Sequence, residues 1–178
     1  MSHKQQLDFV QSVKQQFPNY FVKSNVLEIG SLDINGSVKQ FFTDCAYIGL
    51  DIALGPGVDV VGLGHEYDMP DSTFDCVISC ECFEHDPYYE KTFINMIRLC
   101  RPGGLILFSC ATTGRPEHGT SQCEPQSSPL TVAAGWDYYK NLVEQDFKAI
   151  CDCDQTFSQY QFSQNSTMYD LYFYGIKN

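Results

Sequence analysis

The sequence predicts one α/β domain whose sheet is mostly parallel, with an antiparallel C-terminal strand and helices on both faces. Short apolar runs recur along the chain and alternate with turn signals and helical segments, as in βαβ units. The 178 residues are 43% hydrophobic, which is enough for one buried core. Since no repeat or linker interrupts the chain, we expect residues 1–178 to form a single domain.

The first two thirds of the chain supply five expected strands and most of the helices. Apolar side chains recur at helical spacing over residues 3–17, so an N-terminal helix is expected within residues 1–20. A second long helix is predicted over residues 86–101, because Phe93 and Met96 begin an apolar repeat of three and four residues. Strands are expected at residues 25–30, 46–51, 57–62, 74–81 and 105–111, with a short helix at about 36–42.

The last third begins with a polar segment that is rich in Pro, Gly and Ser. Loops as long as residues 112–130 without secondary structure are usually functional or disordered. A helix is predicted over about residues 130–146. Residues 147–155 and 167–177 are predicted as the closing strands, because aromatic residues alternate with period two in the second of them.

The net charge of −11 disfavours a nucleic acid as the substrate. Eleven Lys and Arg face 22 Asp and Glu, whereas duplex-binding proteins gain affinity by neutralising phosphates with basic side chains. A small molecule, a sugar or a cationic partner fits this charge better. No apolar run is long enough to span a membrane, and the amphipathic start differs from a signal peptide, so we expect a cytoplasmic protein.

Nine cysteines without a secretion signal argue against a disulfide framework. Two pairs, Cys80/Cys82 and Cys151/Cys153, have a C-x-C spacing that also occurs in metal sites. Residues two apart also share one face of a strand, however, and no second ligand pair or ligand histidine is close in the sequence. We therefore interpret the cysteines as buried thiols and predict no metal site.

The segment VLEIGSLDINGS, residues 26–37, continues a buried strand into a loop bounded by glycines. Gly30 and Gly36 do not fit the G-x-G-x-x-G fingerprint, which disfavours a nicotinamide-binding or nucleotide-sugar enzyme. Ligands of parallel α/β sheets bind beyond the carboxyl ends of the strands, where this loop and Asp51 would lie. Asp51 is placed to accept hydrogen bonds from two ribose hydroxyls, with a solvated aspartate as the alternative. Glu28 suits a cationic ligand group or the loop amides.

Five sequence segments follow one another over about residues 25–112: VLEIGSLDINGS, YIGLD, MPDSTFDCVIS, FEHDP and MIRLCRPGGLILFS. In this order they resemble the motifs of class I S-adenosylmethionine-dependent methyltransferases, in particular a small family whose fourth strand ends in Glu-His. The sequence departs from the family pattern at Leu32, which replaces the middle glycine, and at Leu63, which replaces an acidic residue. The resemblance implies a Rossmann-like sheet and S-adenosylmethionine as the methyl donor.

The resemblance also implies where the donor would lie. The methionine moiety would contact the loop after the first strand, and the ribose would contact Asp51. Leu63 would lie beside the adenine, where His65 or backbone groups would replace the acidic side chain. Cys80 and Glu81 would lie beside the donor at the end of the fourth strand. The expected donor-binding residues are Glu28, Gly30, Ser31, Gly36, Asp51, Ile52, Leu63, Gly64, His65, Cys80 and Glu81.

A histidine is the expected general base if the methyl acceptor is an oxygen, because the histidine pKa is near neutrality. His85, from the Glu-His pair, and His118, on the loop over residues 112–130, are the two candidates. A structural residue at the start of a helix and a solvated loop histidine are the respective alternatives. The loop is expected to cover the acceptor. The expected acceptor contacts are Arg115, Glu84 and Tyr138, with a solvated arginine and a core-facing tyrosine as alternatives.

The expected function is therefore methyl transfer from S-adenosylmethionine to a small-molecule or glycan-like acceptor, at oxygen or nitrogen. A non-catalytic donor-binding protein or partner subunit is the first alternative. A nucleic-acid base methyltransferase is a weaker one, because DPYY at residues 86–89 lacks the second proline of the D-P-P-Y motif. The loop over residues 112–130, the N-terminal helix or the second subunit of a homodimer would complete the acceptor site.

Overall fold

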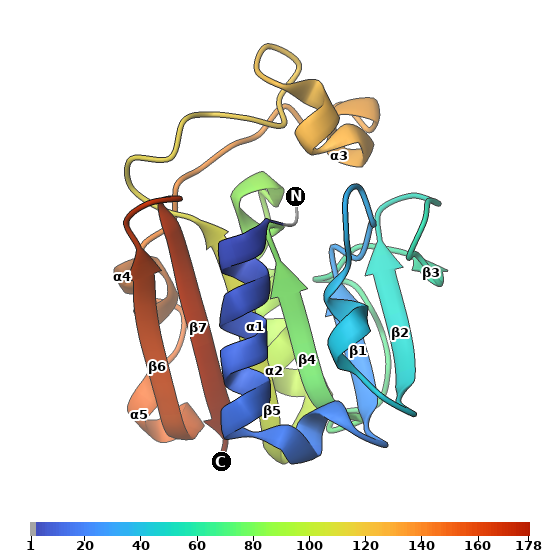
Figure 1. Ribbon diagram of the computed structural model, residues 1–178, viewed down its shortest axis with the longest axis vertical. Coiled ribbons are helices and arrows are strands. Elements are labelled where there is room, and N and C mark those ends of the chain that lie inside the picture. Colours follow the sequence, from blue (N-terminus) through green and yellow to red (C-terminus); the bar gives the residue numbers. More distant parts are fainter. Residues whose placement is uncertain (1–2) are drawn as a thin grey trace.

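The computed structural model describes residues 3–178, and its seven strands form one sheet in the order β3-β2-β1-β4-β5-β7-β6 (Figure 1). The pairs among the first five strands are parallel, and β7 is antiparallel to both β5 and β6. The predicted fold class is confirmed. The strands are β1 (Asn25–Ile29), β2 (Ala46–Asp51), β3 (Val60–Val61), β4 (Phe74–Cys80), β5 (Cys100–Ala111), β6 (Phe157–Asn165) and β7 (Asp170–Lys177).

Helices cover both faces of the sheet, as the sequence predicts. On one face, α1 (Lys4–Gln16) places Val10 in a buried cluster with Ile78 of β4 (Figure 1). On the other face, α2 (Tyr89–Leu99) places Phe93 in a second cluster that also contains apolar residues of β1, β4 and β5. The remaining helical elements are short: η1 (Pro18–Phe21), η2 (Val38–Phe41), η3 (Phe83–His85), η4 (Pro125–Ser127), α3 (Pro129–Ala133), α4 (Glu144–Lys148) and α5 (Cys153–Thr156).

The connection between β1 and β2 contains less helix than predicted. The helix expected over residues 36–42 is the short 3-10 helix η2, whose N-cap Ser37 accepts a hydrogen bond from the amide of Lys39. Residues 30–36 form the loop after β1, which leaves few residues for a longer helix before β2. The strand predicted over residues 57–62 is also shorter, because only the two residues of β3 pair with β2.

The second long helix starts later and ends earlier than predicted. The segment 86–101 was expected to be helical, but η3 and a turn come first and α2 begins at Tyr89. Asp86 still accepts a hydrogen bond from the amide of Tyr88, 2.7 Å from its Oδ1 atom. At the other end, Cys100 pairs with Phe74 of β4. The strand β5 thus begins before residues 102–104, which were expected to separate helix from strand.

The helix predicted over residues 130–146 is wrong. Gly135 has a φ of +76°, a conformation that glycine adopts at no steric cost, and the helix α3 ends just before it. The chain then runs without regular structure to α4 and brings Leu142 into the core, where the Leu142 amide donates to the carbonyl of Ala111. The apolar residues of this segment therefore lie partly in a loop and partly in the core, and not on one face of a helix.

The first predicted closing strand, residues 147–155, is also wrong, whereas the second is confirmed as β7. Asp152 caps α5 by accepting hydrogen bonds from the amides of Asp154 and Gln155. The strand that pairs with β7 is β6, at the edge of the sheet, where many side chains are polar and exposed. No helix within residues 3–178 is long and apolar enough to cross a membrane.

Candidate functional site

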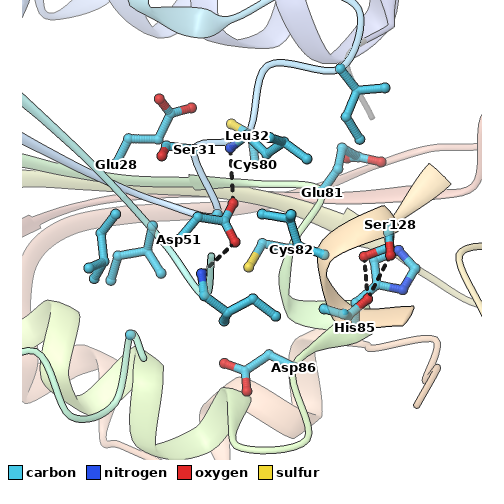
Figure 2. Close-up of a pocket in the computed structure, with 18 of the residues that line it drawn as sticks. Glu28, Ser31, Leu32, Asp51, Cys80, Glu81, Cys82, His85, Asp86 and Ser128 are labelled. Carbon is cyan, nitrogen blue, oxygen red and sulfur yellow. Dashed lines mark hydrogen bonds between the residues drawn. The ribbon is translucent and has the colours of Figure 1, made fainter. Parts of the chain in front are cut away.

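A pocket of about 920 Å³, part of it open to solvent, lies beyond the carboxyl ends of β1, β2 and β4 (Figure 2). The strand order reverses between β1 and β4, and ligands of open α/β sheets bind at such switch points. The residues that line the pocket include predicted donor contacts from every one of these strand ends. They are Glu28, Gly30, Ser31, Gly36, Asp51, Ile52, Gly64, His65, Cys80 and Glu81.

The loop after β1 is shaped by two close approaches. Gly30 has a φ of +79°, and a Cβ atom at this position would lie 2.6 Å from the Sγ atom of Cys82. Only glycine fits there without a shift of the neighbouring chain. Leu32, which takes the place of a family glycine, directs its side chain toward Gly55, where a Cβ atom would lie 2.3 Å from its Cδ1 atom. The Leu32 side chain thus fits because the residue opposite it, Gly55, has no side chain.

Asp51 is held in a fixed orientation at the end of β2. Its Oδ2 atom accepts a hydrogen bond from the amide of Leu32 at 2.9 Å, and its Oδ1 atom accepts one from the amide of Ile52 at 2.8 Å (Figure 2). Burial raises the pKa of Asp51, while these two amides act in the opposite direction. Each carboxylate oxygen has a further lone pair, so the side chain can still accept hydrogen bonds from a ligand.

Glu28 is a buried carboxyl group that projects from β1 into the same pocket. The hydroxyl of Tyr47 donates a hydrogen bond to its Oε2 atom at 2.8 Å. Burial nevertheless raises the pKa of Glu28 to about 8, so the group is mostly protonated at neutral pH. A cationic group placed beside Glu28 would favour its ionised form.

Buried polar atoms without a hydrogen-bond partner lie where α1 meets the ends of β1 and β4. Within residues 3–178, neither amide atom of Gln6 has a hydrogen-bond partner, and the same holds for Ser31 Oγ and Glu81 Oε2. All of these residues are buried and line the pocket. Because a buried polar group is normally hydrogen-bonded, these atoms fit the amino and carboxyl groups of a bound amino-acid moiety.

Glu81 is also part of a charged network beneath this end of the pocket. His3 lies 3.1 Å from Asp170 and 3.6 Å from Glu81, measured from its Nε2 atom to a carboxylate oxygen. Burial alone would lower the pKa of His3, but the two carboxylates outweigh it and raise the pKa to about 9. Arg115 forms a second ion pair with Asp170, at 2.9 Å. The network joins α1 to β4 and β7.

The far side of the pocket is formed by residues 127–136, here called the covering segment. It lies beyond the carboxyl ends of the strands, with α3 at its centre (Figure 1). Its Ser128 lies near His85 in the pocket (Figure 2). Residues 127–130 belong to the loop that was expected to cover the acceptor, whereas residues 131–136 were assigned to the helix over 130–146 and were not expected at the pocket. The residues that line the pocket and were not predicted include Gln6, Leu32, Cys82, Ser128, Leu130 and Trp136.

Comparison with known proteins gives the same fold. Residues 27–108 match the model of a methyltransferase domain family. A 1,6-didemethyltoxoflavin-N1-methyltransferase from Burkholderia thailandensis, solved with S-adenosylhomocysteine, is 15% identical, with a TM-score of 0.66 over 97% of this chain and 78% of that one. The chain carries the class I methyltransferase fold. The predicted resemblance to S-adenosylmethionine-dependent methyltransferases is thus confirmed.

Other solved structures differ in how much of their length this chain covers. A Haemonchus contortus phosphoethanolamine N-methyltransferase, solved with phosphomonomethylethanolamine and S-adenosylhomocysteine, is 16% identical with a TM-score of 0.66. The chain covers 53% of it, and 96% of the chain is matched. The YcgJ protein of Bacillus subtilis is 13% identical, with a TM-score of 0.64 over 99% of both chains. No curated protein sequence matches the chain.

One predicted donor contact, Leu63, is not among the residues that line the pocket, whereas its neighbours Gly64 and His65 are. The carbonyl of Gly64 accepts a hydrogen bond from Asn95 at 2.8 Å, and the ring of His65 lies 4.4 Å from that of Tyr88. This part of the site is therefore held by α2 and the turn before it, and Gly64 and His65 line the pocket there.

Most of the predicted catalytic and acceptor residues do not line the pocket. Arg115 donates to Asp170 and to the carbonyl of Met168, so its guanidinium is engaged within the protein. His118 is buried, and its ring centre lies 5.1 Å from that of His85. Of the predicted catalytic and acceptor residues, only His85 lines the pocket. The remaining four are Glu84, Arg115, His118 and Tyr138.

Proposed function

We propose that the chain is a methyltransferase that uses S-adenosylmethionine as the donor and methylates a small-molecule or glycan-like acceptor at oxygen or nitrogen. The observation that carries this proposal is the orientation of Asp51. Both of its carboxylate oxygens are fixed by backbone amides at the switch point of the sheet, and both retain a lone pair. This arrangement suits the paired hydroxyls of a ribose.

The donor fits the groups that surround Asp51. The Gly30 turn lets a ligand approach the backbone closely, and the amide of Gln6 with the hydroxyl of Ser31 would bind the charged groups of the methionine moiety. Glu28 would then ionise beside the donor's ammonium group. In support, two solved structures with the same fold contain S-adenosylhomocysteine.

The chain's contribution to the reaction would be mainly alignment. S-adenosylmethionine supplies a methyl group whose bond to sulfur breaks as a bond to the acceptor forms, with the electron pair left on sulfur. Holding two reactants in line can contribute roughly 7–11 kcal/mol in favourable cases. His85 is the predicted base that lines the pocket, and burial lowers its pKa to about 3, so the imidazole is neutral at pH 7. The neutral imidazole carries a lone pair on one of its two ring nitrogens, which can bind an electrophile, but a pKa this low makes His85 a weak base.

A small acceptor fits the enclosure better than a polymer. The pocket of about 920 Å³ includes space open to solvent and would also hold the donor, which leaves room for a small acceptor. The covering segment closes its far side, and the net charge of −11 opposes binding to a polyphosphate chain. The toxoflavin precursor and the phosphoethanolamine derivative bound by the two similar proteins are also small molecules.

A protein that binds the donor without catalysis is the second candidate. The observation that favours it is Leu32. This residue lines the pocket and stands where the family that the sequence resembles has a glycine. If Leu32 prevented alignment of the methyl group, binding would persist without turnover. Replacement of Leu32 by Gly should then increase turnover and not only affinity.

Isothermal titration calorimetry tests the proposed donor. We expect S-adenosylmethionine and S-adenosylhomocysteine to bind to the purified chain and NAD not to bind. Failure of the first two ligands to bind would overturn the proposed function. Formation of S-adenosylhomocysteine with a panel of small amines, phenols and sugars then separates an enzyme from a binding protein, because only an enzyme releases the demethylated product.

A further inference from the structure

His85 and two further side chains outside the donor-binding set converge in one cluster. Glu84 and His85 belong to η3, and His118 comes from the loop after β5. One ligand atom from each of the three lies within 4.8 Å of the other two. All three residues are more than nine-tenths buried. This group, here called the Glu-His-His cluster, is not needed to explain donor binding.

The Glu-His-His cluster contains five buried polar atoms that no described residue satisfies. Both carboxylate oxygens of Glu84, both ring nitrogens of His85 and the Nε2 atom of His118 have no hydrogen-bond partner within residues 3–178. A buried carboxylate without a partner is strongly unfavourable, and native proteins normally satisfy such groups. The nearby cation Arg115 is held by Asp170 and Met168. The chain therefore provides ligand atoms here without a counter-charge.

The orientation of His118 presents a lone pair to the cluster. Its Nδ1 atom lies 3.1 Å from the carbonyl oxygen of Pro116, which can only accept a hydrogen bond. The proton must therefore be on Nδ1, and Nε2 carries the lone pair. A backbone carbonyl that binds the second nitrogen is a common feature of metal-ligating histidines, because it fixes both the tautomer and the ring orientation.

The two imidazole rings are also held by packing. The ring of Tyr139 lies 5.6 Å from His85 and 5.0 Å from His118, measured between ring centres. Gly119 also approaches so closely that a Cβ atom there would lie 2.6 Å from the Cε1 atom of His85. Gly119 has a φ of +64°, a conformation that favours glycine. Ligand positions fixed before binding are what a metal site requires.

We propose that Glu84, His85 and His118 bind one divalent transition-metal ion, such as Fe²⁺ or Zn²⁺, at the edge of the donor pocket. Two imidazoles and one carboxylate favour such ions over Mg²⁺ and Ca²⁺, which prefer oxygen ligands. Three protein ligands leave further coordination positions open, as in catalytic rather than structural sites. Because His85 also lines the pocket, the ion would lie where an acceptor could reach it.

The role of the ion rests on the proposed function. A divalent ion orients an oxygen-containing substrate and lowers the pKa of a bound hydroxyl, so the acceptor would release its proton to solvent water and no histidine base would be needed. His85 and His118, predicted as alternative bases, would then act together as ligands. The acceptor class becomes narrower as well, because a hydroxyl or another oxygen group would bind the ion.

Cobalt titration of the metal-free full-length chain tests the site. Co²⁺ gives visible absorption bands whose positions report the ligands, and thiolate ligands add an intense near-ultraviolet band. We expect saturation at one Co²⁺ per chain without a thiolate band, and displacement of Co²⁺ by Zn²⁺. In Glu84→Gln and His118→Ala, affinity should fall at least about tenfold. The controls His65→Ala and Cys82→Ser alter other pocket residues and should bind Co²⁺ as the unmodified chain does.

The proposal is overturned if Co²⁺ does not bind, if its bands are unchanged in both Glu84→Gln and His118→Ala, or if a thiolate band dominates. Glu84→Gln preserves the shape of the side chain, so its result does not depend on whether the His118 variant folds. Titration of the same samples with S-adenosylhomocysteine separates the two proposals. Binding of S-adenosylhomocysteine without Co²⁺ would remove only the metal site, and binding of Co²⁺ without S-adenosylhomocysteine would remove only the proposed donor.

Discussion

Replacing Asp51 with Ala should weaken the binding of S-adenosylhomocysteine at least tenfold. Hydrogen bonds to a charged group contribute about 1.5–3 kcal/mol each, and the Asp51 carboxylate has one remaining lone pair on each of its two oxygens. Two such bonds to a ribose at the low end give about 3 kcal/mol, or a loss of roughly 100-fold. Water can replace part of this interaction, and the amides of Leu32 and Ile52 lose their acceptor, so tenfold is the lower bound.

Calorimetry with S-adenosylhomocysteine and its 2′-deoxy analogue measures this effect directly. The unmodified chain should bind the deoxy analogue more weakly, whereas Asp51→Ala should bind both ligands equally. Asp59→Ala is a matched control, because its carboxylate accepts a hydrogen bond from the amide of Gly49 beside the same strand but lies outside the pocket. An Asp51→Ala protein with a native thermal transition and unchanged affinity would refute the assignment of Asp51 to the ribose.

Three further predictions concern stability. The pKa of Glu28 is raised to about 8, so its stabilisation of the fold is fully present below pH 4.5 and is lost as the pH rises through 8. In urea unfolding, Glu28→Gln should remove a pH dependence of the free energy of unfolding on the order of 2–4 kcal/mol. An unchanged pH profile would contradict this. His3, whose pKa is raised to about 9, stabilises the fold below pH 6.5 and loses this effect as the pH rises through 9; His3→Gln should therefore lower the melting temperature more at pH 6 than at pH 10, and an equal loss would exclude the ion pairs as the cause. Phe93→Ala should lower the free energy of unfolding by about 3–5 kcal/mol, since Phe93 is fully buried among four other phenylalanines, and a loss below 1 kcal/mol would mean that the core rearranges around the cavity.

The strands around the switch point could be predicted from the sequence because local and long-range forces agree there. β2 and β4 are apolar runs that fill the middle of a parallel sheet, and their observed bounds lie within one residue of the prediction. The helix prediction for the segment after Pro129 failed because its apolar residues pack in different places. Trp136 lines the pocket whereas Leu142 is in the core, and Gly135, which precedes both, ends the helix before either is reached.

The donor side of the site was predictable for a similar reason. Its residues follow directly after strands, so the topology of a parallel sheet places them together. The Glu-His-His cluster carried a weaker form of the same signal. His85 and His118 lie a few residues beyond the ends of β4 and β5, which are neighbours in the sheet. What the sequence could not show is that, within residues 3–178, neither carboxylate oxygen of Glu84 has a hydrogen-bond partner, because that depends on how each loop side chain is oriented.

The position of His3 has a practical consequence for work with this protein. The first described residues lie at the pocket end of the sheet, whereas the C-terminus lies at the opposite end (Figure 1). Any affinity tag, fluorophore or surface linker attached ahead of His3 would emerge beside the donor pocket and could disturb the contacts of His3 with Glu81 and Asp170. Immobilisation through Asn178, which is exposed, would leave the pocket facing the solution and suits binding measurements better.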